Sequence, residues 1–224
     1  MRNISIIVAG GSGTRFGSTT PKQFLLLASK PVLQHTLETF APLSDEVVVV
    51  LSVAHHRLWQ QLCSEHRCAV AHRVVAGGDT RWQSVKNALD TLEVIPGDVI
   101  AVHDGVRPLV SQQVIEQAFA TARQQGSAVP VIAVTDSIRQ VKPDGTSHIV
   151  PRSALRAVQT PQAFDAVTLK AAYERPYQPV YTDDASVYEL AGHQVTLIDG
   201  TPTNIKITHP ADLMLAENIL AHGQ

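Results

Sequence analysis

Residues 4–24 read ISIIVAGGSGTRFGSTTPKQF, and this stretch decides the fold. It begins with a short, β-branched apolar run, Ile4–Val8, which is typical of a parallel strand buried on both faces. A turn with Gly10, Gly11 and Gly13 follows; these glycines allow positive φ angles and let the backbone approach a ligand closely. Since ligands of α/β proteins bind beyond the carboxyl ends of parallel strands, this turn is the first candidate for a binding site.

Two cations flank the glycine turn and indicate an anionic ligand. Successive free N–H groups in such a turn form an anion-binding concavity. Arg15 adds a planar fork of donors for phosphate oxygens, and Lys22 adds a compact positive charge. Pro21 fixes the backbone just before Lys22. We expect the turn to hold a polyanion, most plausibly a triphosphate; the alternative is a tight turn with a structural role only.

Two familiar phosphate-binding motifs do not match this turn. A dinucleotide fingerprint that starts at Gly11 needs a glycine where Phe16 stands. It also needs an acid after the next strand, but Val47–Leu51 is followed by Ser52. The P-loop pattern G-x-x-x-x-G-K-[ST] does not occur in the chain.

Strands and helices alternate along the chain, which predicts an α/β fold with a Rossmann-like, mostly parallel sheet flanked by helices. We expect strands at Ile4–Val8, Val47–Leu51, Val70–Val75, Val99–His103, Ala128–Val134, Val195–Ile198 and Thr203–Ile207. We expect helices at Pro31–Phe40, His56–His66, Thr80–Leu92, Gln113–Gln124 and Ala166–Tyr173, another that begins at Asp183-Asp184, and a last one from Pro210 to Ala221. The 224 residues predict a single domain, 1–224. The turns at residues 77–79 and 103–105 then lie at the same sheet edge as the glycine turn.

Residues 135–158 differ from the rest of the chain. Their alternating pattern around Pro143-Asp144-Gly145 predicts a strand, a turn and a second strand. A protruding hairpin cannot bury both faces alone, so we expect this arm to pack against a second copy of the chain. The alternative is a hairpin that lies on its own domain.

Composition excludes several classes of partner. The 18 basic and 20 acidic residues give a formal net charge of −2, so no general attraction to nucleic acid or to anionic membranes is expected. No apolar run is long enough to span a membrane, and the N-terminus lacks the pattern of a signal peptide. Cys63 and Cys68 are expected to be reduced, as in a cytoplasmic protein. Their spacing, with His66 between them, offers no second pair of metal ligands.

Two turns carry residues that could take part in chemistry. Asp104 ends an apolar strand, with Gly105 and Arg107 after it, and could bind Mg²⁺ directly or through water beside a polyphosphate. The alternatives are a helix cap or an ion pair with Arg107. Asp79 and Ser84 flank the other turn and could hold a base or a ribose, but Asp79 could equally cap the helix that follows.

The late part of the chain offers cations and hydroxyls for a second phosphate site, namely Arg152, Thr160, Thr182 and Lys206. No pattern resembles a Ser-His-Asp triad or the paired carboxylates of a glycosidase. Asp183 and Asp184 are adjacent, so their side chains are expected to diverge at the start of a helix, where they complement its dipole.

Seven segments together resemble the 2-C-methyl-D-erythritol 4-phosphate cytidylyltransferase family, over about Ile4 to Glu217. They are AGGSGTRFG, PKQF, GGDTRWQSV, HDGVRP, VPRSALRAVQTPQAF, YTDDASVYE and NIKIT. Ribitol-5-phosphate cytidylyltransferase shares the glycine loop and NIKIT-like segments and is the alternative. The TDDASVYE and VPRSALRAVQTPQ stretches look more like the methylerythritol enzyme.

The resemblance implies transfer of a cytidylyl group from CTP to 2-C-methyl-D-erythritol 4-phosphate, in isoprenoid biosynthesis, with Mg²⁺ or another divalent cation and a homodimeric active unit. Implied catalytic residues are Arg15 and Lys22. Implied nucleotide-binding residues are Ala9, Gly10, Gly11, Gly78, Asp79, Ser84 and Gly105. Implied substrate-binding residues are Asp104, Arg107, Ser137, Arg152, Thr160, Thr182 and Lys206. Of these, Asp104 would lie near the metal and Arg152 would enter the partner's site, while Ser137 stands where the family often has Thr.

The implied nucleophile is a phosphate oxygen. A phosphate monoester has a second pKa near 6 and is largely dianionic at neutral pH, so no general base is needed. Catalysis is then expected to consist of positioning and charge neutralisation. A non-catalytic nucleotide-binding subunit is the alternative from another class. A degenerate site of that kind is expected to lack the cations or Asp104, and all are present.

Overall fold

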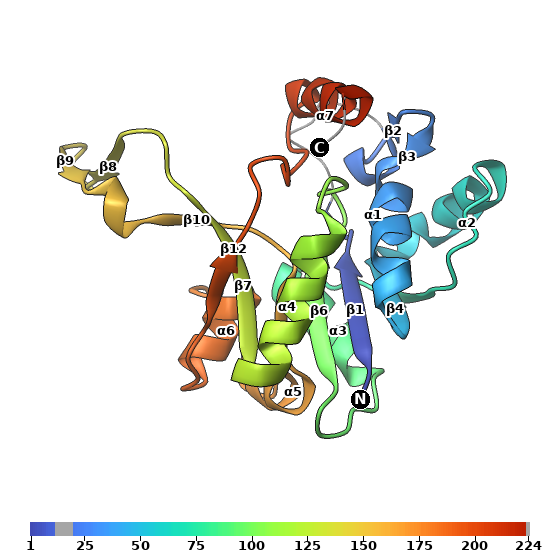
Figure 1. Cartoon of the computed structure of the whole chain (residues 1–224), viewed down its shortest axis with the longest axis horizontal. Coiled ribbons are helices and arrows are strands. Elements are labelled where there is room, and N and C mark those ends of the chain that lie inside the picture. The colour runs from blue at the N-terminus through green and yellow to red at the C-terminus, as the bar shows by residue number, and fades with distance from the viewer. Residues whose placement is uncertain (12–19, 223–224) are drawn as a thin grey trace.

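The computed structural model describes residues 1–11 and 20–222, and Figure 1 shows it as a curled sheet between helices. Gly13 and Arg15 lie outside the described residues. Among the described residues, eight strands form the main sheet, in the order β10-β7-β11-β6-β1-β4-β5, with β12 paired to β7. The strands are β1 (Asn3–Val8), β4 (Glu46–Leu51), β5 (Arg73–Ala76), β6 (Val99–Asp104), β7 (Ser127–Ala133), β10 (Arg156–Val158), β11 (Gln162–Asp165) and β12 (Leu197–Asp199).

The centre of the sheet is parallel. Strand β1 pairs in parallel with both β4 and β6, and β5 pairs in parallel with β4. Strand β11 runs antiparallel between β6 and β7, and β10 is antiparallel to β7. The prediction of a Rossmann-like, mostly parallel sheet is therefore confirmed, with an antiparallel insertion beside β6.

Helices cover both faces of this sheet, as Figure 1 shows. They are α1 (Val32–Phe40), α2 (His56–Glu65), α3 (Arg81–Asp90), α4 (Gln112–Gln125), α5 (Ala166–Tyr173) and α6 (Asp184–Leu190). The last helix, α7 (Pro210–His222), lies beyond the end of the sheet and packs in a separate small core with Val106 and Ile207. Since strand side chains alternate between faces, Ile7 packs in the core under α1, α2 and α4, and Ile4 and Ile6 pack in the core under α3, α5 and α6. Both cores are fully buried along β1, which explains its nearly unbroken apolar run, interrupted only by the buried Ser5.

The strand predictions fail at two places. The sequence does not predict strand β11, because its buried Gln162 interrupts the apolar pattern and bonds to Asp183 and to the N–H of Ala185. Conversely, Thr203–Ile207 is not a strand. Its alternation arises because Ile207 packs in a small core with Val106, while the neighbouring Lys206 is exposed.

The arm is a hairpin of β8 (Ile138–Val141) and β9 (Ser147–Val150), which protrudes from the sheet in Figure 1. Its apolar side chains Val141 and Ile149 are 69% and 70% exposed. The predicted protruding hairpin is thus confirmed, and it exposes apolar side chains.

Two short pieces precede α1, a 3-10 turn at Lys22–Phe24 and the paired strands β2 (Leu26–Leu27) and β3 (Lys30–Pro31). In the described part of the chain, no helix has the length and apolarity to cross a membrane.

A buried carboxylate ties the N-terminus to the sheet at the end opposite the predicted site. The Asp98 side chain is buried and accepts hydrogen bonds from the Arg2 backbone N–H at 2.8 Å and from the Arg2 guanidinium at 2.7 Å. Burial alone would raise the pKa of Asp98, but the bonds from Arg2 outweigh it and hold the pKa below its usual value. Asp98 is therefore ionised at neutral pH.

We expect Asp98→Ala to lower the free energy of unfolding by about 3 kcal/mol at pH 7, since it leaves the partners of a buried carboxylate unpaired. Because the folded pKa is depressed, this contribution is complete above the unfolded pKa of about 3.9 and is lost as the pH falls below it. Asp90→Ala, which removes an exposed pair with Lys86, is the control and is expected to cost less than about 0.5 kcal/mol. Urea unfolding at pH 7 and pH 3 measures both variants. An Asp98 effect of the same size at both pH values contradicts this account.

Candidate active site

The carboxyl ends of β1 and β6 and the turn before α3 enclose a cavity of about 400 Å³. This is the sheet edge at which the sequence predicts three polar turns to meet. The predicted site residues that line the cavity come from four separate parts of the chain: Ala9, Gly10, Gly11, Lys22, Gly78, Asp79, Ser84, Asp104 and Lys206. Arg15 lies outside the described residues.

The glycine turn does not use the conformational freedom of its first two glycines. Gly10 and Gly11 both have φ angles outside the left-handed region. A Cβ atom added to Gly10 would lie 3.7 Å from Ser84 Oγ, and one added to Gly11 would meet no atom of the described residues within 4 Å. Neither the turn nor the packing requires glycine at either position. Their missing side chains instead keep this wall of the cavity open to a ligand.

Gln23 fixes the glycine turn and was missed in the sequence. Its buried side-chain amide donates hydrogen bonds to the carbonyl of Ala9 at 2.7 Å and to that of Gly11 at 3.3 Å. Gln23 directly follows Lys22 in the Lys22–Phe24 turn, so these bonds hold Lys22 and the glycine backbone in one arrangement. A polar residue inside PKQF is the only signal that the sequence offers, and its partners are backbone groups that no pattern identifies.

The turn before α3 is held by a serine. The Ser84 hydroxyl accepts a hydrogen bond from the Gly78 N–H at 3.1 Å and donates one to the Thr80 carbonyl at 2.9 Å. Thr80 caps α3 by accepting from the Gln83 N–H at 3.0 Å, so the alternative that Asp79 caps the helix is wrong. Asp79 lies exposed at the cavity wall, where its carboxylate faces solvent or a ligand.

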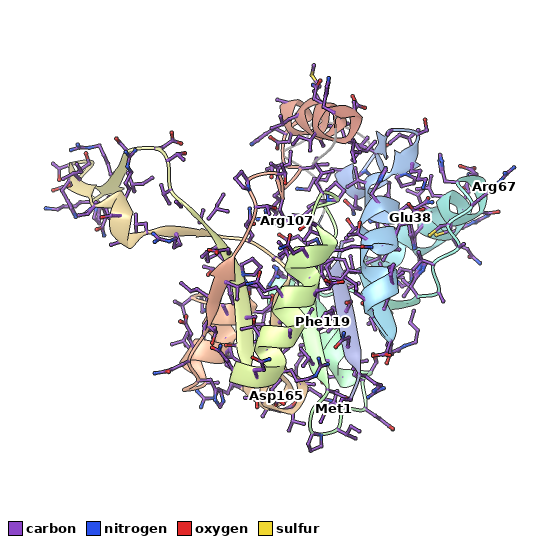
Figure 2. All side chains as sticks on the ribbon, in the orientation of Figure 1. Met1, Glu38, Arg67, Arg107, Phe119 and Asp165 are labelled. Carbon is purple, nitrogen blue, oxygen red and sulfur yellow. The ribbon has the colours of Figure 1, made fainter. Side chains whose placement is uncertain are left out.

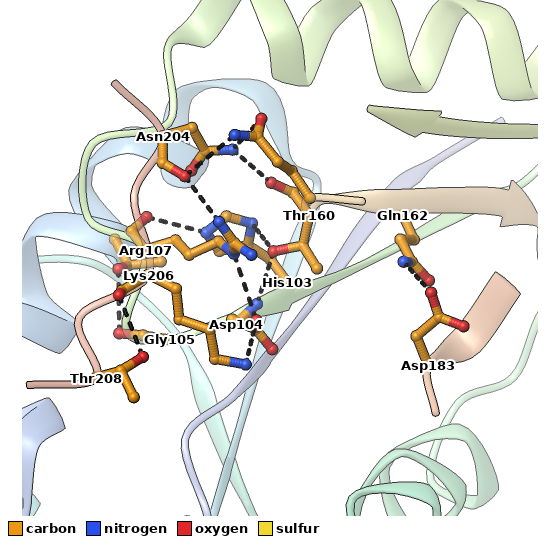
Figure 3. Close-up of polar contacts among 12 residues, drawn as sticks. His103, Asp104, Gly105, Arg107, Thr160, Gln162, Asp183, Asn204, Lys206 and Thr208 are labelled. Carbon is orange, nitrogen blue, oxygen red and sulfur yellow. Dashed lines mark hydrogen bonds and ion pairs between the residues drawn. The ribbon is translucent and has the colours of Figure 1, made fainter. Parts of the chain in front are cut away.

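Asp104 lies at the end of β6 among three cations. Its carboxylate is 2.9 Å from Lys206 Nζ, 3.4 Å from Arg107 Nε and 3.7 Å from Arg81 Nε. Figure 3 shows Lys206 and Arg107 converging on it. Burial alone would raise the pKa of Asp104, but Arg81, Lys206 and Arg107 hold it well below its usual range. The carboxylate is thus ionised at neutral pH. Asp104 both pairs with Arg107 and lines the cavity. It does not cap a helix, since no helix begins there.

Arg81 is a second residue that the sequence did not reveal. Its guanidinium donates to Asp184 Oδ2 at 2.6 Å and faces Asp104, and it lines the cavity. Asp184 is fully buried and also accepts from the Tyr173 hydroxyl at 2.6 Å. Asp183 points elsewhere, to Gln162, so the two acids diverge as predicted. Arg81 therefore joins the α3 turn to the start of α6, a link between segments about a hundred residues apart.

Other predicted site residues lie behind the cavity or away from it. Gly105 is buried against Ala9, whose Cβ would lie 2.9 Å from a Cβ added at Gly105. Thr160 is buried behind Asp104, and its hydroxyl oxygen accepts a hydrogen bond from the Asp104 backbone N–H at 3.1 Å. Arg107 donates to the Asn204 carbonyl at 2.7 Å.

Three more lie outside the cavity altogether. Thr182 is exposed just before α6, and Ser137 and Arg152 are exposed on the arm. The Arg152 guanidinium donates to the carbonyl of Thr135, at the base of the arm. Figure 2 shows how far the side chains of the arm stand from the rest of the chain. Within one chain, these three residues do not meet the others.

Comparison with known proteins gives one consistent result. The family model of 2-C-methyl-D-erythritol 4-phosphate cytidylyltransferase matches residues 4–222. The chain is 49% identical over 221 residues to the protein of that name from Porphyromonas gingivalis, covering 98% of each. It is 45% identical to the one from Bacteroides fragilis, covering 98% of this chain and 100% of the relative.

Solved structures agree with the sequence comparison. The crystal structure of 2-C-methyl-D-erythritol 4-phosphate cytidylyltransferase from Thermus thermophilus superposes with a TM-score of 0.78 at 31% identity, covering 99% of this chain and 100% of that one. The 4-diphosphocytidyl-2C-methyl-D-erythritol synthase of Anaerococcus prevotii gives a TM-score of 0.82 at 25% identity, covering 98% and 96%. The chain belongs to the 2-C-methyl-D-erythritol 4-phosphate cytidylyltransferase family.

Proposed function

We propose that the chain joins CTP to 2-C-methyl-D-erythritol 4-phosphate and releases pyrophosphate, giving 4-diphosphocytidyl-2-C-methyl-D-erythritol in non-mevalonate isoprenoid biosynthesis. The observation that carries this proposal is the cavity in which the open glycine turn, Lys22 and the Asp104–Lys206 pair converge. On one side it offers the backbone of the glycine turn and Lys22 for a triphosphate, and on the other the Asp104–Lys206 ion pair. Membership of the family supplies the identity of the two substrates.

In the reaction, a phosphate oxygen of the sugar phosphate forms a bond to the α-phosphorus of CTP, and the bond from that phosphorus to the pyrophosphate breaks. The nucleophile needs no base because a phosphate monoester is largely dianionic at neutral pH. The protein must instead bring two anions together, which calls for fixed cations. Lys22, together with Arg15, takes up negative charge on the α-phosphate and on the leaving pyrophosphate.

Substrate recognition divides between the two sides of the cavity. On the nucleotide side we assign the backbone of Ala9, Gly10 and Gly11 to the phosphates and Gly78, Asp79 and Ser84 to the cytidine, with Gly105 supporting Ala9 from behind. On the other side, Asp104 and Lys206 face the sugar phosphate. Its remaining proposed contacts are Arg107, Ser137, Arg152, Thr160 and Thr182, with Thr160 acting through Asp104, to whose N–H it is bonded.

The residues of the cavity fit a divalent cation that is held mainly by phosphate oxygens. Mg²⁺ at such sites commonly takes one or two carboxylates and keeps several waters, and Asp104 is an ionised carboxylate on the cavity wall. Among the described residues, no group of three or more His, Cys, Asp or Glu side chains could hold a metal ion. When bound, the cation would neutralise charge on the phosphates. We assign Asp104 to it, directly or through water.

We further propose that the active unit is a homodimer in which the arm of one chain reaches the cavity of the other. The exposed Val141 and Ile149 support an interface on the arm, and Arg152 is remote from the cavity of its own chain. If Arg152 serves the partner's site, mixing inactive Arg152→Ala and Lys22→Ala chains restores activity, because one of the two sites in each mixed dimer is intact. We expect up to about a quarter of wild-type turnover from a random mixture of equal amounts. No gain over the separate variants, although mixed dimers form, excludes a site shared between chains.

The two glycines at positions 11 and 105 provide a matched pair of variants. Gly11→Ala is expected to change the free energy of unfolding by less than about 0.5 kcal/mol, since the added methyl group meets no atom within 4 Å in the part of the chain that the structure describes. It is expected to weaken CTP binding about tenfold, because the methyl group enters the cavity. Gly105→Ala is expected to cost about 1–3 kcal/mol of stability through its clash with Ala9. Urea unfolding and calorimetric CTP titration check both; a destabilised Gly11→Ala with unchanged CTP affinity contradicts the assignment.

Pyrophosphate release tests the proposed function. The purified protein with Mg²⁺ and CTP is supplied with 2-C-methyl-D-erythritol 4-phosphate, with ribitol 5-phosphate, or with neither. Release with the first alone is the expected result. Release only with ribitol 5-phosphate favours the related cytidylyltransferase, and CTP binding without release favours a non-catalytic nucleotide-binding subunit.

A further inference from the structure

The imidazole of His103 is buried directly beside the cavity, and the proposed reaction gives it no role. His103 is the residue before Asp104, at the end of β6, and its side chain has no exposed surface. The ring packs on Phe40, with centroids 4.7 Å apart. Each ring nitrogen has a partner: Nε2 lies 3.1 Å from the Arg107 carbonyl oxygen, and Nδ1 lies 3.0 Å from the Thr160 hydroxyl.

These partners determine the tautomer of the ring. A carbonyl oxygen only accepts, so Nε2 must carry the hydrogen. A neutral imidazole carries one N–H only, so Nδ1 of the fully buried ring is the acceptor. The Thr160 hydroxyl must therefore donate to Nδ1, and its oxygen accepts from the Asp104 N–H at 3.1 Å. The direction of every hydrogen bond from Asp104 to Arg107 is thereby fixed.

The chain of hydrogen bonds closes into a ring through Asn204, as Figure 3 shows. Arg107 donates to the Asn204 carbonyl at 2.7 Å, and the buried Asn204 side chain donates to the Thr160 carbonyl at 2.8 Å. Asp104 is next to His103 in sequence, and Lys206 follows Asn204 by two residues. The ring therefore fixes the backbone on both sides of the Asp104–Lys206 pair.

We propose that His103 is a positioning residue for the second substrate: as its Nε2–H tautomer, it aligns Thr160 and Arg107 so that the Asp104–Lys206 pair faces the sugar phosphate. This inference rests on the proposed function. It assigns His103 no contact with substrate and no proton transfer. None of the hydrogen bonds of this ring involves a residue of the glycine turn or of the α3 turn, to which we assign the nucleotide. His103 is consequently expected to govern the sugar phosphate and not CTP.

Variants of His103 can separate its two hydrogen bonds. His103→Leu removes both, and we expect kcat/KM for the sugar phosphate to fall about 10- to 100-fold, largely through KM, as when other supporting hydrogen bonds are lost. His103→Asn places an amide near the Nδ1 position, where its oxygen can accept from Thr160, and is expected to recover to within about fivefold of wild type. His103→Gln places its amide near Nε2 and keeps only the bond to Arg107, so it is expected to recover less, because Thr160 and not Arg107 bonds the Asp104 backbone. CTP affinity, titrated separately, is expected to change less than about threefold in all three.

A second histidine gives a matched control. His72 also makes two ring hydrogen bonds, to the Val70 carbonyl at 2.8 Å and from Trp59 Nε1 at 2.9 Å, but it lies away from the cavity. His72→Leu is expected to lose stability and to leave KM for the sugar phosphate unchanged. If His103→Leu weakens CTP binding as much as it raises that KM, or if His72→Leu raises it equally, His103 acts only on general stability and the inference is overturned.

The tautomer can be measured without turnover. Nitrogen-15 chemical shifts of the His103 ring in the wild-type protein are expected to show a protonated Nε2 and an unprotonated Nδ1. The opposite tautomer, with the hydrogen on Nδ1 and none on Nε2, overturns the inference even if the kinetics agree. Wild-type protein that binds CTP but turns over neither sugar phosphate overturns the proposed function, and the positional role with it. Normal wild-type turnover with an unchanged KM in His103→Leu and His103→Asn overturns the inference alone.

Discussion

Lys22→Ala is expected to lower kcat at least about 100-fold, the size of effect typical of losing one electrostatic donor in the transition state. The reaction brings a dianionic phosphate against a triphosphate, so charge neutralisation is the main task of the protein. Lys22 lines the cavity, and the turn that carries it is held against the glycine backbone by Gln23. The backbone that carries Lys22 is therefore held beside the glycine turn before the substrates arrive.

Steady-state pyrophosphate release measures this effect. Lys22→Arg keeps the charge but changes a compact ammonium into a broad planar group, so partial activity is expected. Lys30→Ala is the control, since Lys30 pairs with Glu38 at the surface, and its loss is expected to leave kcat unchanged. Near-wild-type kcat in Lys22→Ala would remove Lys22 from the mechanism.

Asp104→Asn is expected to reduce kcat/KM for the sugar phosphate by at least about 100-fold, mostly as a higher KM, and to weaken the dependence on Mg²⁺. The substitution keeps the shape of the side chain but removes the negative charge that Lys206, Arg107 and Arg81 surround. Three cations are then left without their common partner, and Lys206 is free to move. CTP binding is expected to change much less, since Asp104 lies beyond the glycine turn.

The pH dependence of this variant has a definite sign. Since the folded pKa of Asp104 is depressed, its ion pairs are present above about pH 4 and are lost only at lower pH. Asp104→Asn is thus expected to lower kcat/KM for the sugar phosphate by the same factor at every pH between about 6 and 9, so that the shape of the pH profile does not change. Asp199→Asn, at the exposed edge strand β12, is the control and is expected to behave as wild type. An Asp104→Asn enzyme with wild-type KM and metal dependence contradicts the assignment.

Much of the fold follows from local sequence patterns. The apolar runs at Ile4–Val8, Val47–Leu51 and Val99–His103 predict buried parallel strands because both faces of the sheet are covered. Strand β11 escapes this reasoning, since the amide of Gln162 is satisfied by α6, which lies about twenty residues later in the chain. Residues 203–207 alternate like a strand, but the alternation reflects packing against Val106 without a strand partner.

The site was predictable where a charge or a glycine stands at or near the end of a strand. Asp104 ends β6, and Lys22 was found because it follows the glycine turn after β1. Arg81 and Gln23 could not, because their importance comes from partners that the fold brings close: Asp184 is about a hundred residues from Arg81, and Gln23 bonds to backbone groups. The glycine turn was identified for an incomplete reason, since Gly10 and Gly11 leave space and do not need positive φ.

A direct competition tests the central claim, that this cavity transfers the cytidylyl group to methylerythritol phosphate. Equal amounts of 2-C-methyl-D-erythritol 4-phosphate and ribitol 5-phosphate are incubated in one vessel with CTP, Mg²⁺ and the protein, and the products are identified by mass. The account predicts 4-diphosphocytidyl-2-C-methyl-D-erythritol as the dominant product, with its formation abolished in Lys22→Ala. Equal amounts of the two products, or an excess of the ribitol product, would contradict it.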